Sequence, residues 1–212
     1  MEDRFETSRL EAFSDGVFAI AITLLVLDIT VPASGFDHLW EAIGDQWPHY
    51  LGYITSFLTI GGLWLVHHGI LRRMRYADPT VLRLNLLLLM VVAFLPFPTR
   101  LAADAITKTS AERPAVIVYG VTLFAISVIL TALVSYVSDR EDLVHEGIQR
   151  EHVQAAAVRV RPGLGFYGAV LVLAIFAPRL AAFGFLAIAL LALAPSRRPA
   201  GTRTDGPSSR AP

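Results

Sequence analysis

Long uncharged, apolar runs alternate with short polar segments along this chain. A helix of about 20 apolar residues crosses a hydrocarbon core of about 30 Å. Runs close to that length predict six membrane-spanning helices, at about residues 9–31, 48–71, 81–99, 114–138, 162–178 and 180–196. The short polar connections favour one compact helical bundle. We therefore expect an all-α membrane protein, with residues 1–195 as a single transmembrane domain.

The segments outside these runs have patterns of their own. Phe36, Leu39, Trp40, Ile43 and Trp47 recur at helical spacing. This spacing indicates either a short amphipathic helix at the membrane interface or a loop with aromatic anchors. Prolines at 96 and 98 predict a break or kink at the end of the third span. The final segment, 196–212, is rich in Pro, Gly, Ser and Arg, and is predicted to be a disordered cytoplasmic tail.

Composition and charge narrow the possible functions. The chain is 54% hydrophobic and 17% charged, and it has no cysteine, so disulfides and thiolate metal sites are excluded. Six spans leave no room for a soluble catalytic domain, and no phosphate-binding loop or zinc-protease motif occurs. We expect no enzyme, no cofactor and no nucleic-acid partner. If both termini are cytoplasmic, 14 of the 18 basic residues lie on the inner side, as the positive-inside rule favours.

The first span carries a carboxylate near each end. At about 100° per residue, Phe13, Ile20, Leu24 and Leu27 share one helix face with Gly16, Thr23 and Val31, and Asp15 lies nearly opposite. Asp15 is predicted either to anchor helix packing or to take part in proton sensing or ion handling. Asp28 lies roughly 20 Å further along the helix axis. It is predicted either to attract cations at a pore mouth or to be a solvated helix end.

Polar residues of three spans fall at the same predicted level. The inner ends of the first three spans carry Arg9, His67, His68 and Asn85, which together with Asp15 predict a polar cluster that joins the helices. Arg9 and Asp15 are six residues apart, so they do not face each other on a straight helix. The adjacent histidines diverge by about 100° and make a poor chelating pair, so we expect no metal site.

Several of these residues form a recognisable pattern. It consists of Arg9-x-x-x-Phe13-Ser14-Asp15, Trp64-x-x-His67-His68, Asn85 and Leu95-Pro96-Phe97. The pattern resembles the transmembrane protein 175 family, which includes the endolysosomal potassium channel and its prokaryotic relatives. The resemblance covers residues 9–100. It implies a homotetramer in a bacterial plasma membrane, with the first helix of each subunit lining a pore for potassium ions.

The resemblance also implies roles for residues of the first helix. Ile20 forms the inner apolar constriction, Thr23 supplies a hydroxyl layer, and Leu27 forms the next apolar ring, with Leu24 beside it. The motif residues Arg9, Phe13, Ser14, Asp15, Trp64, His67, His68 and Asn85 form a structural polar network. A ring of isoleucines sheds water, so it closes a pore without a charged plug.

Other interpretations of the same residues remain. An Ile and Leu face on a membrane helix is commonly exposed to lipid or packed in a core. The alternative function is a proton-coupled secondary transporter that uses Asp15 and a histidine of the second span. Such transporters usually have broken helices or internal repeats, and neither is evident in the sequence. An intramembrane enzyme needs several polar groups at depth, and the last three predicted spans contain almost none.

Overall fold

The computed structural model describes residues 5–108, 110–145 and 150–193. Its elements are β1 (Phe5–Glu6), α1 (Thr7–Leu24), η1 (Leu25–Asp28), η2 (Ala33–His38), α2 (Leu39–Asp45), α3 (Trp47–Leu71), β2 (Tyr76–Ala77), α4 (Pro79–Phe94), α5 (Pro96–Ala105), α6 (Glu112–Ser138), η3 (Glu141–Leu143), α7 (Arg150–Phe176) and α8 (Pro178–Leu193). The all-α class is confirmed. The predicted tail at 196–212 and the end of the sixth span lie outside the described residues.

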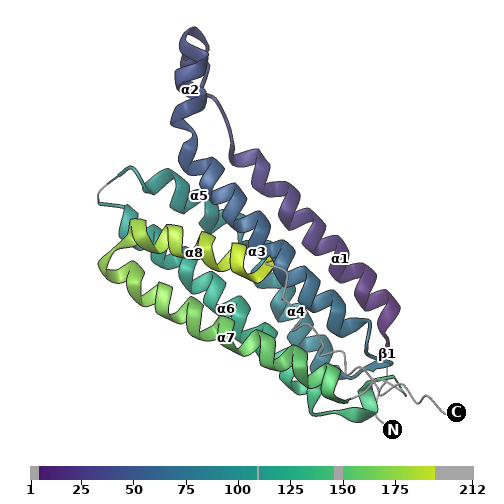
Figure 1. Ribbon diagram of the computed structural model, residues 1–212. Helices are drawn as coiled ribbons and strands as arrows, with labels where there is room; N and C mark the ends of the chain where they lie inside the picture. The colour runs from purple at the N-terminus through teal and green to yellow at the C-terminus, as the bar shows by residue number, and fades with distance from the viewer. Residues whose placement is uncertain (1–4, 109, 146–149, 194–212) are drawn as a thin grey trace, which may run out of the picture.

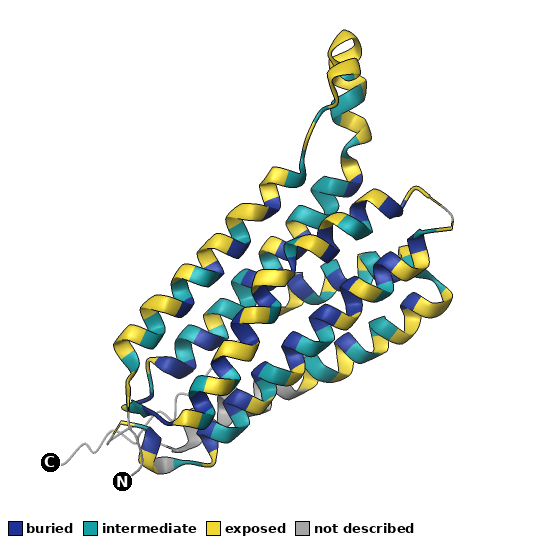
Figure 2. Ribbon diagram, turned by 180° about the vertical axis from the view of Figure 1, so that it is seen from behind, coloured by how far each residue is buried: buried dark blue, intermediate teal, exposed yellow. Residues whose placement is uncertain are grey.

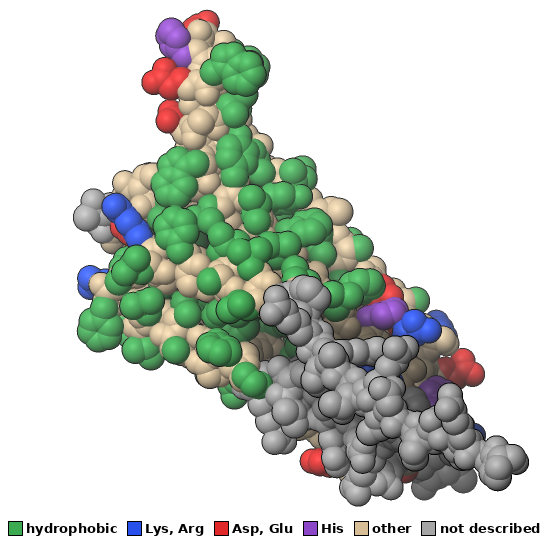
Figure 3. Space-filling view, in the orientation of Figure 1, with side chains coloured by type: hydrophobic (Ala, Val, Ile, Leu, Met, Phe, Trp, Pro, Cys, Tyr) green, Lys and Arg blue, Asp and Glu red, His purple; other side chains and the backbone are tan. Residues whose placement is uncertain are grey.

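The helices form a single elongated bundle, and α2 projects beyond one end of it (Figure 1). α6 packs against α4, α5 and α7, while α1 packs against α3 and α4. Hydrophobic side chains cover the middle of the visible face, and charged side chains gather toward its ends (Figure 3). This distribution is typical of a bundle that crosses a lipid bilayer.

Within the described residues, four helical segments are long and apolar enough to cross a membrane. They are residues Thr7–Asp28, Trp47–Leu71, Pro79–Ala105 and Glu112–Ser138. Two shorter apolar helices, Pro162–Phe176 and Pro178–Leu193, follow them along the chain. The predicted division of the last apolar region is present, because α7 ends at Phe176 and α8 begins at Pro178.

The first helix ends earlier than the sequence pattern predicts. α1 becomes the 3₁₀ helix η1 at Leu25, and Ile29 is already extended, with φ −87° and ψ 96°. The predicted helix end at Val31 is therefore wrong by three residues. Pro32 disfavours helical backbone at the residue before it, so the chain leaves the helix before the proline. Val31 consequently lies outside the helix face to which it was assigned.

The helices around two prolines differ in part from the prediction. Pro96 lacks a backbone N–H and separates α4 from α5, as expected, but α5 then continues to Ala105 rather than ending at Thr99. Pro162, expected to begin the fifth span, lies inside α7. The polar residues 150–161, which precede the predicted fifth span, therefore belong to the same helix as that span.

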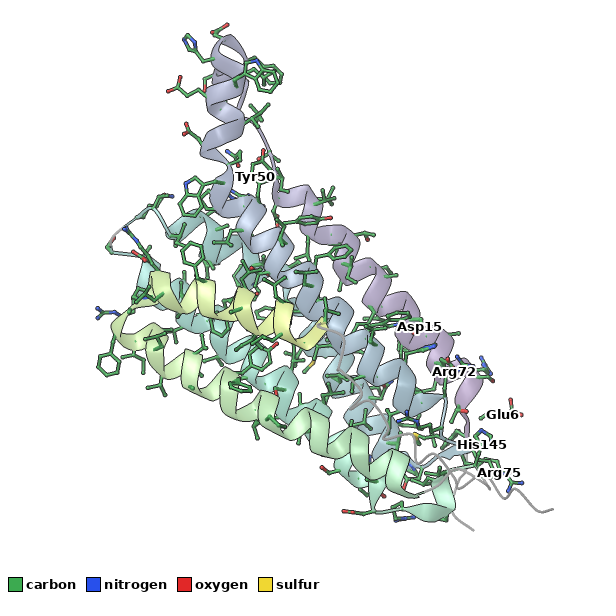
Figure 4. All side chains as sticks on the ribbon, viewed as in Figure 1. Glu6, Asp15, Tyr50, Arg72, Arg75 and His145 are labelled. Carbon is green, nitrogen blue, oxygen red and sulfur yellow. The ribbon has the colours of Figure 1, made fainter. Side chains whose placement is uncertain are left out.

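Short extended segments that the sequence pattern did not predict are hydrogen-bonded to one another at one end of the bundle. Phe5 pairs with Ala77 and Glu6 with Tyr76 in a two-stranded antiparallel ladder. The backbone N–H of Arg75 also donates to the carbonyl of Leu143 at 2.7 Å. These bonds join the start of the chain, the α3–α4 turn and the α6–α7 connector. Glu6, Arg75 and His145 lie at this end in Figure 4, and Tyr50 lies toward the other end.

Candidate ion-conducting helix and its supports

The outward face of α1 is apolar and is not covered by other described residues of the chain. Ile20 is 60% exposed, Leu27 66% and Leu24 42%, and Thr23 is also exposed. In the most apolar 18 residues of the segment Thr7–Asp28, 22% are buried among the described residues, against 50% in the corresponding part of α6. Figure 2 shows exposed residues along the outer side of α1 at the edge of the bundle. The face predicted to line a pore is therefore not part of the subunit core.

The inward face of α1 is tightly packed. Ser14, Phe18, Ala21 and Leu25 are all at most 1% exposed. They recur every three or four residues, which is the period that places side chains on one side of a helix. The ring of Phe18 lies 5.2 Å from that of His67, centroid to centroid, and this contact joins α1 to α3. α1 thus has one face fixed to the subunit and the opposite face free.

A fully buried hydrogen-bond network joins α1, α3 and α4. Asn85 Nδ2 donates to Ser14 Oγ at 3.1 Å, and His67 Nε2 lies 2.6 Å from Asn85 Oδ1. Ser14 also donates to the carbonyl of Leu10 at 2.7 Å. All three side chains of this network are 0% exposed. Because membrane helices have little hydrophobic drive to associate, such bonds fix their relative register.

A second, partly exposed cluster joins α1 and α3 on the neighbouring side. Trp64 Nε1–H donates to Asp15 Oδ1 at 2.7 Å. The ring of His68 stacks on that of Trp64, with centroids 5.1 Å apart. His68 Nδ1 lies 3.2 Å from Glu11 Oε1 and 3.7 Å from Asp15 Oδ2. Figure 4 shows Asp15 on α1 toward the end of the bundle that also carries Arg72.

Two predicted members of the polar network lie elsewhere. Arg9 is exposed and forms no ion pair within residues 5–108, 110–145 and 150–193. Its six-residue separation from Asp15 directs the two side chains to different sides of α1. Phe13 is 55% exposed and lies on the free face with Ile20. The structure thus brings together Ser14, His67 and Asn85 in one cluster, and Asp15, Trp64 and His68 in another.

Asp28 is the last residue of η1, at the other end of the first span. Its carboxylate is 19% exposed and lies 3.8 Å from Arg100 Nη1 on α5. Arg100 Nε in turn lies 3.7 Å from Asp104 Oδ2, and the other oxygen of this carboxylate, Oδ1, lies 3.1 Å from His49 Nε2. Asp28 is therefore linked to α5 through a charged group, an arrangement that neither sequence interpretation of Asp28 contained.

The sequence reasoning missed a third polar cluster and one member of the second. Ser56 Oγ lies 2.8 Å from Thr99 Oγ1 and 3.0 Å from Tyr119 Oη, joining α3, α5 and α6 within the core. Hydroxyls are common in membrane helices, so their spacing carries no clear signal. Glu11 was also missed, although it lies one turn before Asp15 and therefore shares its face of α1.

These features define a class of protein. A bundle of apolar helices of membrane-spanning length, with buried interhelical polar clusters, is a multi-pass membrane protein.

Comparison with known proteins gives the family. Residues 9–96 match the sequence model of the endosomal/lysosomal potassium channel TMEM175. The chain is 41% identical over 186 residues to a potassium channel of Streptomyces collinus, covering 86% of this chain and 90% of that protein. It is also 35% identical over 142 residues to the endosomal/lysosomal proton channel TMEM175 of Gallus gallus, but spans only 28% of that protein.

A solved structure is similar as well. The crystal structure of a lysosomal potassium-selective channel TMEM175 homolog from Chamaesiphon minutus superposes with a TM-score of 0.79 at 35% identity, covering 88% of this chain and 95% of that one. The chain belongs to the TMEM175 family, as a bacterial member.

Proposed function

We propose that this chain is a subunit of a homotetrameric potassium channel whose pore is lined by α1. In this proposal the last two apolar helices complete six spans, both termini are cytoplasmic, and the channel resides in the bacterial plasma membrane. The names of the Streptomyces and Chamaesiphon relatives support potassium as the permeant ion. The proposed activity is transport, not catalysis.

The free apolar face of α1 is the observation that carries the proposal. Ile20 and Leu27 are more than half exposed, although Phe18 and Leu25 on the other face are buried. In a fourfold assembly this free face meets its copies around the axis. The alternative of a face packed in the subunit core does not agree with these exposures, which leaves lipid as the competing environment.

Ile20 is the proposed constriction. Isoleucine side chains around an axis exclude water, so ions cannot pass until the helices rotate or splay. Leu24 and Leu27 continue the apolar lining toward the outer end. Selectivity then arises from partial dehydration, which costs less for potassium than for the more strongly hydrated sodium ion.

Thr23 is the proposed hydroxyl layer. Its Oγ1–H donates to the carbonyl of Ile20 in its own helix at 2.9 Å. The hydroxyl hydrogen is thereby occupied, and the oxygen lone pairs remain available to a cation. A ring of such oxygens offsets part of the cost of removing water from the ion.

The two polar clusters are the proposed supports of the pore helix. The Ser14–Asn85–His67 network holds the inward face of α1 against α3 and α4. The Trp64–Asp15 bond holds the N-terminal half of α1 against α3. With these anchors at one end and the Asp28–Arg100 pair at the other, a change in either end alters the orientation of Ile20.

Currents from the reconstituted protein test this function. We expect Ile20→Asn to wet the constriction, which increases the current and reduces the difference between potassium and sodium permeability. Met90→Asn on α4 is the matched control, because Met90 is 62% exposed but lies on a different helix. Equal effects of the two substitutions on current contradict a pore along α1.

A proton-coupled transporter is the second candidate, and the proximity of Asp15 Oδ2 to His68 Nδ1, 3.7 Å, is the observation in its favour. The same liposomes separate the two candidates. A transporter moves potassium only in proportion to proton flux. A channel carries potassium current at equal pH on both sides.

A further inference from the structure

We propose that Glu11, Asp15 and His68 form a binding site for a divalent transition-metal ion such as Zn²⁺. The site joins α1 to α3 and is separate from the proposed ion pathway, because Asp15 lies nearly opposite the free face of α1. The sequence-based expectation of no metal considered only the adjacent pair His67 and His68. In the folded chain His68 faces two carboxylates of another helix instead.

The spacing of the three side chains suits a small cation. One nitrogen and two carboxylate oxygens, one from each residue, all lie within 4.8 Å of one another. His68 Nδ1 is 3.2 Å from Glu11 Oε1 and 3.7 Å from Asp15 Oδ2. Two ligands about 2.1 Å from a tetrahedral zinc ion lie roughly 3.4 Å apart. The observed distances therefore lie close to those of an occupied site.

The ligand atoms lack better partners in the described chain. His68 Nδ1 is a buried atom that makes no hydrogen bond of proper geometry with any described residue, although it points at the two carboxylates. Glu11 and Asp15 are four residues apart on one helix face, where like charges repel. A divalent cation between them satisfies the nitrogen lone pair and offsets that repulsion.

The surroundings orient the ligands and leave access. Trp64 Nε1–H holds Asp15 Oδ1 at 2.7 Å, which leaves Oδ2 on the side of His68. Such an outer hydrogen bond is the usual support of a ligating carboxylate. The side chains of Glu11, Asp15 and His68 are 26%, 37% and 27% exposed, so an ion and a bound water can enter from solvent. Imidazole and carboxylate together suit Zn²⁺, Co²⁺ or Ni²⁺.

A second histidine–carboxylate contact provides a matched control. His49 Nε2 lies 3.1 Å from Asp104 Oδ1 at the other end of the bundle. Arg100, however, lies 3.7 Å from the same carboxylate and places a positive charge beside it. A metal ion is disfavoured there, although the histidine–carboxylate distance is similar.

Calorimetric titration of Zn²⁺ into the purified full-length chain, freed of any affinity tag, tests the site. We expect saturable binding of one ion per chain. Glu11→Gln and His68→Gln should each weaken the affinity by about tenfold or more, because ligand-sphere changes have effects of at least that order. His49→Gln should bind Zn²⁺ as the unaltered chain does. Thermal unfolding in the absence of metal shows which variants are folded.

The readout is binding and not current, so it stands whether or not the chain conducts potassium. At the same Zn²⁺ concentration, metal-dependent stabilisation of the folded chain is expected to be smaller in the Glu11→Gln variant, which keeps the size of the side chain but loses its charge. Absence of saturable binding to the unaltered chain overturns the site. Equal binding by the Glu11→Gln variant, or an equal loss in the His49→Gln variant, overturns it as well.

Discussion

Trp64 on α3 donates its indole N–H to the carboxylate of Asp15 on α1, with 2.7 Å between Nε1 and Oδ1. The indole also stacks on His68, one turn further along α3. This hydrogen bond connects two of the sequence motifs, and it fixes the position of α1 against α3 at the level of Asp15. A bond to an ionised group contributes more than one between neutral groups.

A double-mutant cycle measures this bond. We expect Trp64→Phe and Asp15→Asn each to lower the free energy of unfolding in detergent, and their combination to cost less than the sum. The expected coupling is about 1–2 kcal/mol, within the range for residues in direct contact. The measurements are made with a metal chelator present. Additive effects, with coupling below about 0.5 kcal/mol, contradict the bond.

Removing the central residue of the buried network should destabilise the bundle. Asn85→Leu removes the partner of His67 Nε2 and the amide N–H that Ser14 Oγ accepts, both in a fully buried site, while Ser14 keeps its bond to the carbonyl of Leu10. We expect a loss of about 1–3 kcal/mol in the free energy of unfolding, the usual cost of unpaired buried polar groups.

Thr122→Val is the control for that substitution. Thr122 is also buried, but it donates only to the carbonyl of Val118 in its own helix, at 2.9 Å. Its loss should cost less than the loss of Asn85. If thermal denaturation ranks the two variants in the opposite order, the network does not join the three helices as described.

Gly120 should be intolerant of any side chain. A Cβ atom there would lie 2.8 Å from Phe185 Cζ and 2.9 Å from Leu171 Cδ1, and Phe185 is fully buried. We expect Gly120→Ala to destabilise the packing of α6 against α7 and α8 by about 1–3 kcal/mol, as overpacking generally does. Gly61→Ala is the control, since its added Cβ would meet no described atom within 4 Å beyond its chain neighbours and the backbone of its own helix. A harmless Gly120→Ala would contradict this packing.

Thr23 tests the proposed hydroxyl layer. Thr23→Val keeps the shape of the side chain but removes its oxygen, so we expect the preference for potassium over sodium to fall. The measurement is the reversal potential with potassium on one side of the membrane and sodium on the other. Thr122→Val, away from α1, should leave that potential unchanged. An unchanged reversal potential in the Thr23→Val variant would contradict a role of the Thr23 hydroxyl in potassium selectivity.

Residues on regular helices were predicted best from the sequence. The apolar run at 48–71 matches α3 within one residue, and the helical projection correctly separates Ile20 from Asp15. Both results depend only on hydropathy and the 3.6-residue period. The predicted end of the first helix was wrong because the apolar run continues to Val31, whereas the backbone is already extended at Ile29, ahead of Pro32.

Contacts between distant segments were not predictable in the same way. The sequence grouped Arg9 with Asp15 and His68 because all three fall at the inner ends of the predicted spans. In the folded chain His68 does lie beside Asp15, but the third member of that cluster is Glu11 and not Arg9. Which neighbours face a helical residue depends on how the second helix is rotated and shifted, and local periodicity contains no information on either. The strand pair at Phe5–Glu6 was missed because two residues are too few for a pattern.

Cysteine modification distinguishes a pore-lining α1 from an α1 that faces lipid, because the chain contains no cysteine of its own. Single substitutions Ile20→Cys and Leu27→Cys are introduced, with Met90→Cys on the exposed surface of α4 as the control. A water-soluble, positively charged thiol reagent is then applied while potassium current through reconstituted protein is recorded. If α1 lines the pore, modification at positions 20 and 27 blocks the current and modification at position 90 does not. Unreactive cysteines at positions 20 and 27 in conducting channels would contradict it, because the free face of α1 would then lie against lipid.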